Sequence, residues 1–210
     1  MNNLPISMKK DSTLTPCVGR PRCFDPDVAL EKAMRVFWEK GYEGASLTDL
    51  TGAMGINRPS LYATFGNKEE LFFKVMNRYG DGPAAYVMKA LELPTAHAVI
   101  HQILHATVDL LSDPQNPRGC LIMQSALTCS DEADAVRQEA RARRVAGEAK
   151  IRLRFERAVL EGDLPRSMNP EDLARYVVML MHGLSVQGAN GATPQQMRRV
   201  VEFALKTLPL

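Results

Sequence analysis

Residues 46–79 read SLTDLTGAMGINRPSLYATFGNKEELFFKVMNRY, and the capping signals in this stretch decide the fold. Ser46 precedes an apolar-periodic run and is followed three residues later by Asp49, a capping-box spacing that begins a helix. Gly55 lies where that helix must end in a sharp turn, and Asn57 can cap the helix that follows. These signals predict two short helices joined by a tight turn.

A third helix follows almost at once. Pro59 suits the first turn of the second helix, because the N–H that proline lacks would be unpaired there. Gly66 ends that helix, and Asn67 begins the next one with Glu70 as its capping partner. The stretch therefore predicts a helix-turn-helix motif followed by a supporting helix.

The second helix of this motif has two faces of different chemistry. Leu61 and Phe65 are four residues apart and should be its buried anchors. A basic group, two hydroxyls and a phenol then lie away from the anchors, on a face made of Arg58, Ser60, Tyr62, Ala63 and Thr64. Such a face suits a DNA groove with its base edges and phosphates, although an ordinary solvent-facing helix has a similar composition.

Lys68 stands in the first turn of the supporting helix, where the helix dipole disfavours a cation. A DNA phosphate bound by Lys68 and by the N-terminal amides would compensate. Upstream, residues 1–23 contain several prolines and a basic excess that includes Arg20 and Arg22. We expect a flexible basic arm there, followed from Asp25 by a helix that supplies the aromatic core under the motif.

Bulk properties exclude some classes of protein. The 210 residues carry a net charge of +2, which neither demands nor excludes nucleic acid. The four cysteines form no C-x-x-C pair, so zinc-ribbon and thioredoxin-like sites lack support. We find no signal-peptide core and no apolar run long enough to span a membrane. The sequence predicts a cytoplasmic protein with reduced thiols and no membrane association.

Residues 19–72, GRPRCFDPDVALEKAMRVFWEKGYEGASLTDLTGAMGINRPSLYATFGNKEELF, closely resemble the DNA-binding domain of TetR-family transcriptional repressors. The resemblance covers about residues 19–79. It implies that the second helix of the motif enters the major groove. By the resemblance, the residues that contact bases or backbone are Arg58, Pro59, Ser60, Tyr62 and Thr64. The residues at phosphate-contacting positions are Ser46, Thr48 and Lys68. Arg20 and Arg22 lie where some members of the family have a basic arm near DNA. Ala63 and Thr64 stand where many members carry bulkier side chains, which leaves Arg58 as the main expected guanine reader.

The remainder of the chain reads as helix, with no period-2 strand pattern. The prediction is an all-α fold with a three-helix head at 24–80 and a larger helical domain for ligand binding and dimerisation at 83–210. Arginines and glutamates alternate along residues 131–161, which favours a salt-bridged solvent face over a second nucleic-acid surface. The helices expected in the body span about 84–91, 95–111, 120–127, 130–161, 169–187 and 193–207.

The 170–187 helix is apolar nearly all round, so one side needs cover beyond its own core. A second subunit is the simplest cover, and the resemblance to TetR-family proteins implies a homodimer formed through a helix bundle. The expected dimer contacts are Tyr176, Val177, Leu180, Met181 and Leu184.

The body should also enclose an apolar ligand cavity. The expected lining includes His101, His105, Cys120, Met123 and Leu127. His97, His101 and His105 recur every fourth residue and suggest metal ligands, but boundary histidines explain the spacing better, and we expect no metal or other cofactor. Cys120 begins a helix, a position that favours reactive thiols, whereas a buried cysteine is often only a small apolar side chain.

Together these features predict a homodimeric, ligand-responsive transcriptional regulator. The expected activity is repression, relieved when a small-molecule or thiol-reactive inducer releases the protein from a palindromic double-stranded operator. Activation stays open, as do the inducer and the operator sequence. The alternative is an all-α small-molecule-binding protein or enzyme that uses the body cavity, but no nucleophile–base pair or phosphate loop supports catalysis.

Overall fold

The computed structural model describes residues 24–128 and 133–208, without the side chains of residues 125–128. Within these ranges the chain forms helices and no strand, which confirms the predicted all-α fold. No helix in the described part of the chain is long and apolar enough to cross a membrane. The helices are α1 (Pro26–Gly44), α2 (Leu47–Met54), α3 (Arg58–Phe65), α4 (Lys68–Asp81), α5 (Tyr86–Ala90), α6 (Ala96–Ser112), α7 (Leu121–Thr128), α8 (Asp134–Glu161), α9 (Pro170–Ala189) and α10 (Pro194–Thr207).

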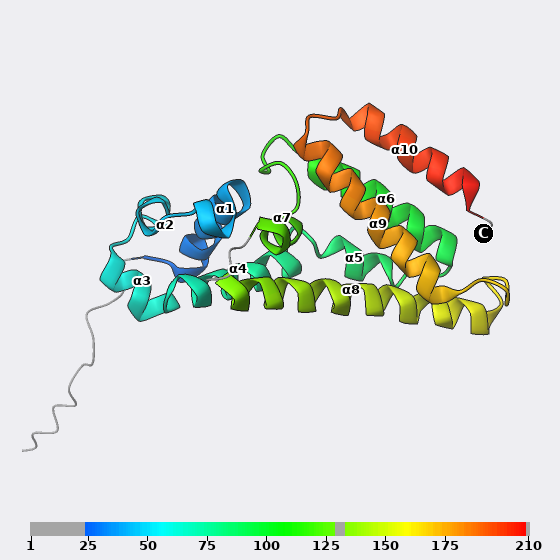
Figure 1. Cartoon of the computed structure of the whole chain (residues 1–210), viewed down its shortest axis with the longest axis horizontal. Helices are drawn as coiled ribbons and strands as arrows, with labels where there is room; N and C mark the ends of the chain where they lie inside the picture. The colour runs from blue at the N-terminus through cyan, green and yellow to red at the C-terminus, as the bar shows by residue number, and fades with distance from the viewer. Residues whose placement is uncertain (1–23, 129–132, 209–210) are drawn as a thin grey trace, which may run out of the picture.

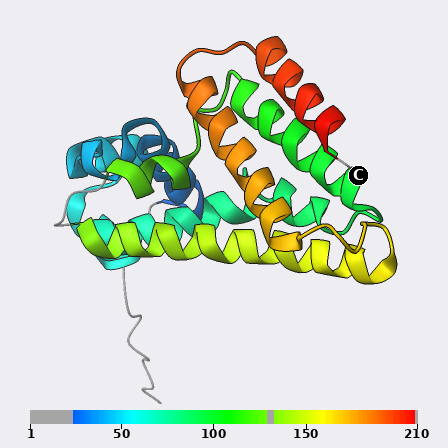
Figure 2. The ribbon, with the colours of Figure 1, turned by 45° about the vertical axis from the view of Figure 1, so that its right-hand side comes forward.

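The head lies at one end of an elongated molecule (Figure 1). Helices α1–α3 form the head, and α4 leads from it into the body. The long helix α8 runs along one side from the head to the far end, while α6, α9 and α10 lie across from it in both views (Figures 1 and 2). Helix α7 packs on α1 and α8, between head and body.

The predicted caps are present. Ser46 with Asp49 and Asn67 with Glu70 form complete capping boxes, and Asn57 caps α3. Gly55 has φ 70°, which a left-handed turn requires. The expected cap at Ser130 lies outside the described residues, and α8 is described from Asp134, after Ala133, with no side-chain cap.

Two apolar cores hold the molecule together. The first contains Phe37 and Leu61 of the head and Phe72 of α4, and continues into Leu121 of α7 and Val136 of α8. It therefore crosses the boundary expected near residues 80–83. The second core fills the body between α6, α8, α9 and α10. The head therefore packs directly against the starts of α7 and α8.

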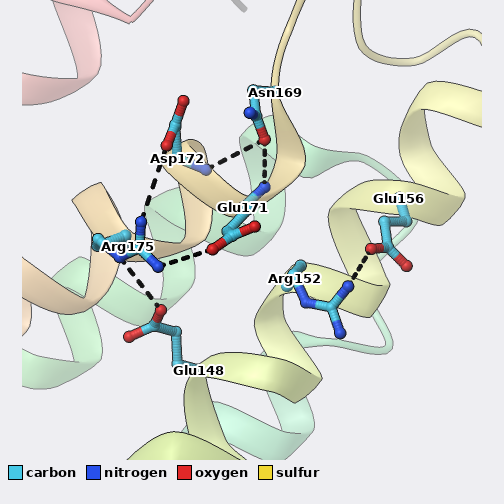
Figure 3. Close-up of polar contacts among 7 residues, drawn as sticks. All are labelled: Glu148, Arg152, Glu156, Asn169, Glu171, Asp172 and Arg175. Carbon is cyan, nitrogen blue, oxygen red and sulfur yellow. Dashed lines mark hydrogen bonds and ion pairs between the residues drawn. The ribbon is translucent and has the colours of Figure 1, made fainter.

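The charged face of α8 confirms the expected salt-bridged pattern. Arg175 of α9 also joins this helix to α8, because its Nε lies 3.6 Å from Glu148 Oε1 (Figure 3). Within α9, Arg175 Nη2 lies 2.8 Å from Glu171 Oε1. Exposed pairs of this kind contribute little stability each. Within α8 the pairs are Asp134–Arg137, Glu139–Arg143, Arg152–Glu156 and Arg157–Glu161.

Candidate DNA-binding surface and ligand cavity

The start of α2 is held by reciprocal hydrogen bonds. The Asp49 N–H donates to Ser46 Oγ at 3.0 Å, and the Ser46 hydroxyl donates to Asp49 Oδ2 at 2.7 Å. Lys40 Nζ lies 2.6 Å from Asp49 Oδ1. These bonds from Lys40 and Ser46 hold the pKa of the Asp49 carboxyl well below its usual range. The carboxylate is therefore ionised at neutral pH and keeps α2 capped, and the Ser46 hydroxyl is engaged within the protein.

Helix α3 is anchored by the two predicted side chains. Leu61 is 0% and Phe65 is 4% exposed, so both lie in the head core. The opposite face presents Tyr62, which is 49% exposed, beside exposed Arg58 and Pro59. Ser60 and Thr64 are half-buried and Ala63 is exposed. The helix thus turns a basic and phenolic surface outward, as the spacing predicts.

Arg58 and Thr48 meet across the turn. Arg58 Nη2 donates to Thr48 Oγ1 at 3.2 Å, and both residues are exposed. This contact joins α2 to α3 and holds the guanidinium beside the exposed face of α3. Two residues that were expected to contact DNA separately are therefore hydrogen-bonded to each other.

Two lysines fix the junction between α3 and α4. Lys68 Nζ lies 4.5 Å from the centroid of the Tyr42 ring, a cation–π contact that keeps the ammonium group near the start of α4. Lys74 Nζ donates to the carbonyl of Phe65 at 2.8 Å and so satisfies one of the unpaired carbonyls that end α3. Sequence reasoning missed Lys74, because a contact nine residues away across a turn leaves no periodic signal. Arg20 and Arg22 lie outside the described residues.

A cavity of about 360 Å³ opens between α4 and the body helices. Its wall is mostly apolar, but two phenols carry polar groups into it. The Tyr79 hydroxyl donates to Cys120 Sγ at 3.5 Å, and Tyr86 Oη lies 2.9 Å from Thr107 Oγ1. Burial raises the pKa of Tyr79 well above its ordinary value and that of Tyr86 to about 12, so both phenols stay neutral. The wall includes Met76, Tyr79, Tyr86, Thr107, Cys120, Met123, Arg144, Ile151, Met181, His182 and Ser185.

The expected ligand residues separate into three groups. Cys120 and Met123 line the cavity, and the side chain of Leu127 lies outside the described residues. His101 and His105 do not line it, which corrects the expectation for these two. His105 Nε2 lies 3.2 Å from Glu202 Oε1 of α10, because the histidine side of α6 faces α10 or solvent. Among the described residues, no group of three or more histidines, cysteines or carboxylates is arranged to hold a metal ion.

The expected dimer residues lie in different environments of the protomer. Val177 and Leu184 are buried in the protomer's own core, and Met181 lines the cavity. Tyr176 and Leu180 are half-buried. Other apolar side chains of α9 and α10 are exposed instead: Met179 (60%), Val186 (48%), Val200 (52%) and Phe203 (71%). We call these four residues the α9–α10 face.

The cavity wall is bonded to the head. The buried Trp38 Nε1 donates to the Gly119 carbonyl at 2.9 Å, directly before Cys120. The Trp38 ring also packs edge-on against Tyr79, with ring centroids 4.9 Å apart. The loop between α6 and α7 and the end of α4 therefore meet at one side chain of α1. Trp38 therefore contacts both of these elements of the cavity wall.

Two family models match the chain. The model described as bacterial regulatory proteins, tetR family, matches residues 29–75, and that of a tetracyclin repressor-like C-terminal domain matches residues 97–204. The HTH-type transcriptional repressor ComR of Escherichia coli (strain K12) is 31% identical over 208 residues, which cover 96% of this chain and 98% of ComR.

Solved structures agree in fold and length. A cysteine mutant of the TetR family transcriptional regulator CifR, in complex with 26-bp double-strand operator DNA, is 41% identical with a TM-score of 0.87. The match covers 90% of this chain and 100% of that one. A TetR transcriptional regulator from Rhodococcus sp. RHA1 is 38% identical with a TM-score of 0.60, over 87% of this chain and 98% of that chain.

Proposed function

Because the chain belongs to the TetR family of bacterial transcriptional regulators, we propose that it is a dimeric repressor that a small molecule releases from its operator. The observation that carries the proposal is the outward face of α3 on a fully capped helix-turn-helix. Arg58 and Tyr62 are exposed there, while Leu61 and Phe65 fix the helix from behind. The relative CifR, which is bound to operator DNA in its structure, supports the same use of this surface.

The proposed contacts divide by chemistry. Base edges are contacted by Arg58, with Tyr62 and Thr64 beside it and Pro59 and Ser60 at the start of α3. Thr48 and Lys68 contact phosphates from the two sides of α3, together with the backbone N–H groups at the start of α2 near Ser46. Arg20 and Arg22 would add contacts from the N-terminal arm. Two heads then bind half-sites of a palindrome separated by ~34 Å or a multiple of it.

Replacement by alanine should change DNA binding in different ways at Arg58 and at Lys68. Arg58→Ala should weaken operator binding by about 1–3 kcal/mol and relax the preference at one base position, because a guanine contact is lost. Lys68→Ala should weaken all DNA sequences alike and lower the slope of log K against log salt by about 1. Fluorescence anisotropy titrations on operator and scrambled duplexes, at several salt concentrations, measure both effects. If each variant loses only non-specific affinity, specific recognition by α3 is rejected.

A footprint on the DNA that flanks the gene tests the proposal as a whole. We expect protection of a palindrome, with affinity that falls with salt and exceeds that for unrelated duplexes by roughly a thousandfold or more. Equal affinity for every sequence would indicate a non-specific DNA-compacting protein instead. Absence of DNA binding would favour the alternative of a small-molecule-binding protein or enzyme, although the named relatives are transcriptional regulators. A repressor of this kind acts in the bacterial cytoplasm, where its operator lies.

The proposed release mechanism runs from the cavity to the head. Tyr79 belongs to α4, and Cys120 directly follows Gly119, whose carbonyl accepts from Trp38, so a ligand between Tyr79 and Cys120 displaces two supports of the head. Such a ligand weakens operator binding if it favours a spacing of the two heads that does not match the half-sites. A thiol-reactive inducer would act at the same place by modifying Cys120.

Alkylation of Cys120 should imitate an occupied cavity. Iodoacetamide adds a carboxamidomethyl group to the sulfur, which ends the Tyr79–Cys120 contact and fills part of the cavity. We expect operator affinity to fall by roughly tenfold, within the usual range of allosteric coupling. Cys120→Ser is the control, because it retains Cys17, Cys23 and Cys129 and should keep its affinity after the same treatment. An equal loss in both proteins would assign the effect to another cysteine.

A further inference from the structure

The cavity has the size and wall of a site for one small apolar molecule. A volume of about 360 Å³ holds roughly a dozen non-hydrogen atoms, taking ~30 Å³ for each as in liquid water. Apolar side chains line much of its wall, and methionine is the most frequent residue there. An apolar body alone would fill such a space, so the charged groups in the wall decide which polar group the ligand carries.

Most of the charged wall residues are already paired or face solvent. Arg143 donates to Glu139 Oε1 and to Asn77 Oδ1, both at 2.7 Å. Asp81 and Lys150 are exposed at the rim, and Lys150 Nζ lies 3.7 Å from Met88 Sδ. Besides Glu148, the phenols and the thiol, the remaining ionisable side chains in the wall are those of Arg144 and His182.

Arg144 differs from the other arginines in this wall. It is half-buried, and its Nε is buried without a hydrogen-bond partner. Glu148, one turn further along α8, would be its natural partner, but Glu148 pairs with Arg175 of α9, as Figure 3 shows. Arg144 forms no ion pair with any described residue. Arg144 therefore brings to the cavity wall a positive charge that no carboxylate among the described residues neutralises.

His182 stands beside this donor. It comes from α9, opposite α8, and lines the same cavity. Burial, and then the neighbouring charge of Arg144, lower the pKa of His182, so the imidazole is neutral at pH 7. A neutral imidazole can donate one hydrogen bond without adding a second charge to be compensated. Arg144 therefore provides one fixed positive charge, and His182 provides one neutral hydrogen-bond donor.

We infer that the ligand of this cavity is a small apolar carboxylic acid, bound as its carboxylate by Arg144 and His182 with its apolar body toward Tyr79 and Cys120. The carboxylate supplies the counter-charge that the Arg144 guanidinium lacks, and planar two-oxygen geometry matches an arginine fork. The apolar body then reaches the two wall elements that are bonded to Trp38. The inference rests on the proposed function only for the consequence of binding, which is release from the operator.

Binding of 4-phenylbutyrate tests the inference, with the neutral 4-phenylbutanamide as its counterpart of equal size. Isothermal titration calorimetry on the full-length protein, without DNA, gives both affinities, and fluorescence of the single Trp38 follows binding independently. We expect the acid to bind the wild type roughly tenfold or more tightly than the amide, because a hydrogen bond to a charged group replaces a neutral one.

Three variants locate the charge. Arg144→Met should raise the Kd of 4-phenylbutyrate by roughly tenfold to a hundredfold and leave the amide within about twofold. Arg144→Lys keeps the charge and should recover part of the affinity. Arg141→Met removes the same charge from an exposed position of α8 that does not line the cavity, and should leave both ligands unchanged. Retained amide binding shows that Arg144→Met is folded.

The inference is overturned if the acid does not bind, if the amide binds the wild type as tightly, or if Arg144→Met and Arg141→Met behave alike. Stronger binding of 4-phenylbutylamine would indicate a cation site and would also overturn it. The operator footprint is a separate measurement. If the acid binds through Arg144 but leaves operator affinity unchanged, the ligand site stands and the proposed release mechanism fails.

Discussion

A Met179→Glu/Phe203→Glu double variant should be a monomer that binds the operator roughly a hundredfold or more weakly than the wild type. Both side chains are largely exposed on the α9–α10 face, at 60% and 71%. Beside them a groove of about 310 Å³ runs between α9 and α10, lined in part by Leu180 and Val200. A second protomer that covers this face would bury each apolar side chain, and two glutamates would place unpaired charges there.

The loss in DNA affinity follows from linkage of the two heads. A dimer binds its second half-site as an intramolecular event, which raises affinity by ~10²–10⁴ over one head alone. A monomer keeps the contacts of α3 with one half-site and loses that gain. The double variant should therefore bind full operator and isolated half-site almost equally. Light scattering coupled to size-exclusion chromatography gives the mass, and anisotropy titrations give the two affinities.

A matched control carries the same charges on another face. Val145→Glu/Leu160→Glu changes two exposed apolar residues of α8, 62% and 87% exposed. Helix α8 lies on the opposite side of the body from α10 (Figure 1). This control should remain dimeric with unchanged operator affinity. A dimer of normal affinity in the Met179→Glu/Phe203→Glu variant would show that the protomers associate through a different surface.

Local signals in the sequence predicted the head well because each one acts over a few residues. Ser46 and Asp49 satisfy N–H groups at the start of their own helix, and Gly55 adopts a left-handed conformation within its own turn. The spacing of Leu61 and Phe65 likewise fixes the buried side of α3 without reference to any distant element. The outward face of α3 then follows by exclusion.

The body was less predictable because its faces depend on which helices are neighbours. A helix that is apolar nearly all round, such as α9, does not reveal which arc its own core covers. Val177 and Leu184 were therefore expected at the dimer surface, although both are buried in the protomer's own core. The same limit applies to His101 and His105, which lie toward α10 and solvent rather than the cavity. The unpaired Nε of Arg144 could not be predicted at all, since it depends on Arg175 drawing Glu148 away.

Gly66→Ala should destabilise the head by roughly 2–4 kcal/mol, the sum of backbone strain and a damaged helix cap. Gly66 joins α3 to α4 with φ 83° and ψ −153°, a conformation that is essentially restricted to glycine. A Cβ at this position would also overlap the carboxylate of Glu70. That carboxylate accepts the Asn67 N–H at 2.8 Å and completes the cap of α4. The substitution therefore strains the junction and disturbs the start of the next helix together.

The consequence for DNA binding follows from the position of this junction. Helix α3 is held on one side by the turn from α2 and on the other by Gly66, with Lys74 bonded to the Phe65 carbonyl. A shifted junction tilts the outward face of α3, so operator affinity should fall by roughly tenfold or more even where the head stays folded. Gly52→Ala is the matched control: a Cβ there meets nothing within 4 Å in the helical α2, and it should stabilise the head by about 0.5–1 kcal/mol. Urea unfolding followed by Trp38 fluorescence measures both changes, and equal midpoints for the two variants would show that the α3–α4 junction tolerates a side chain and does not fix the pose of α3.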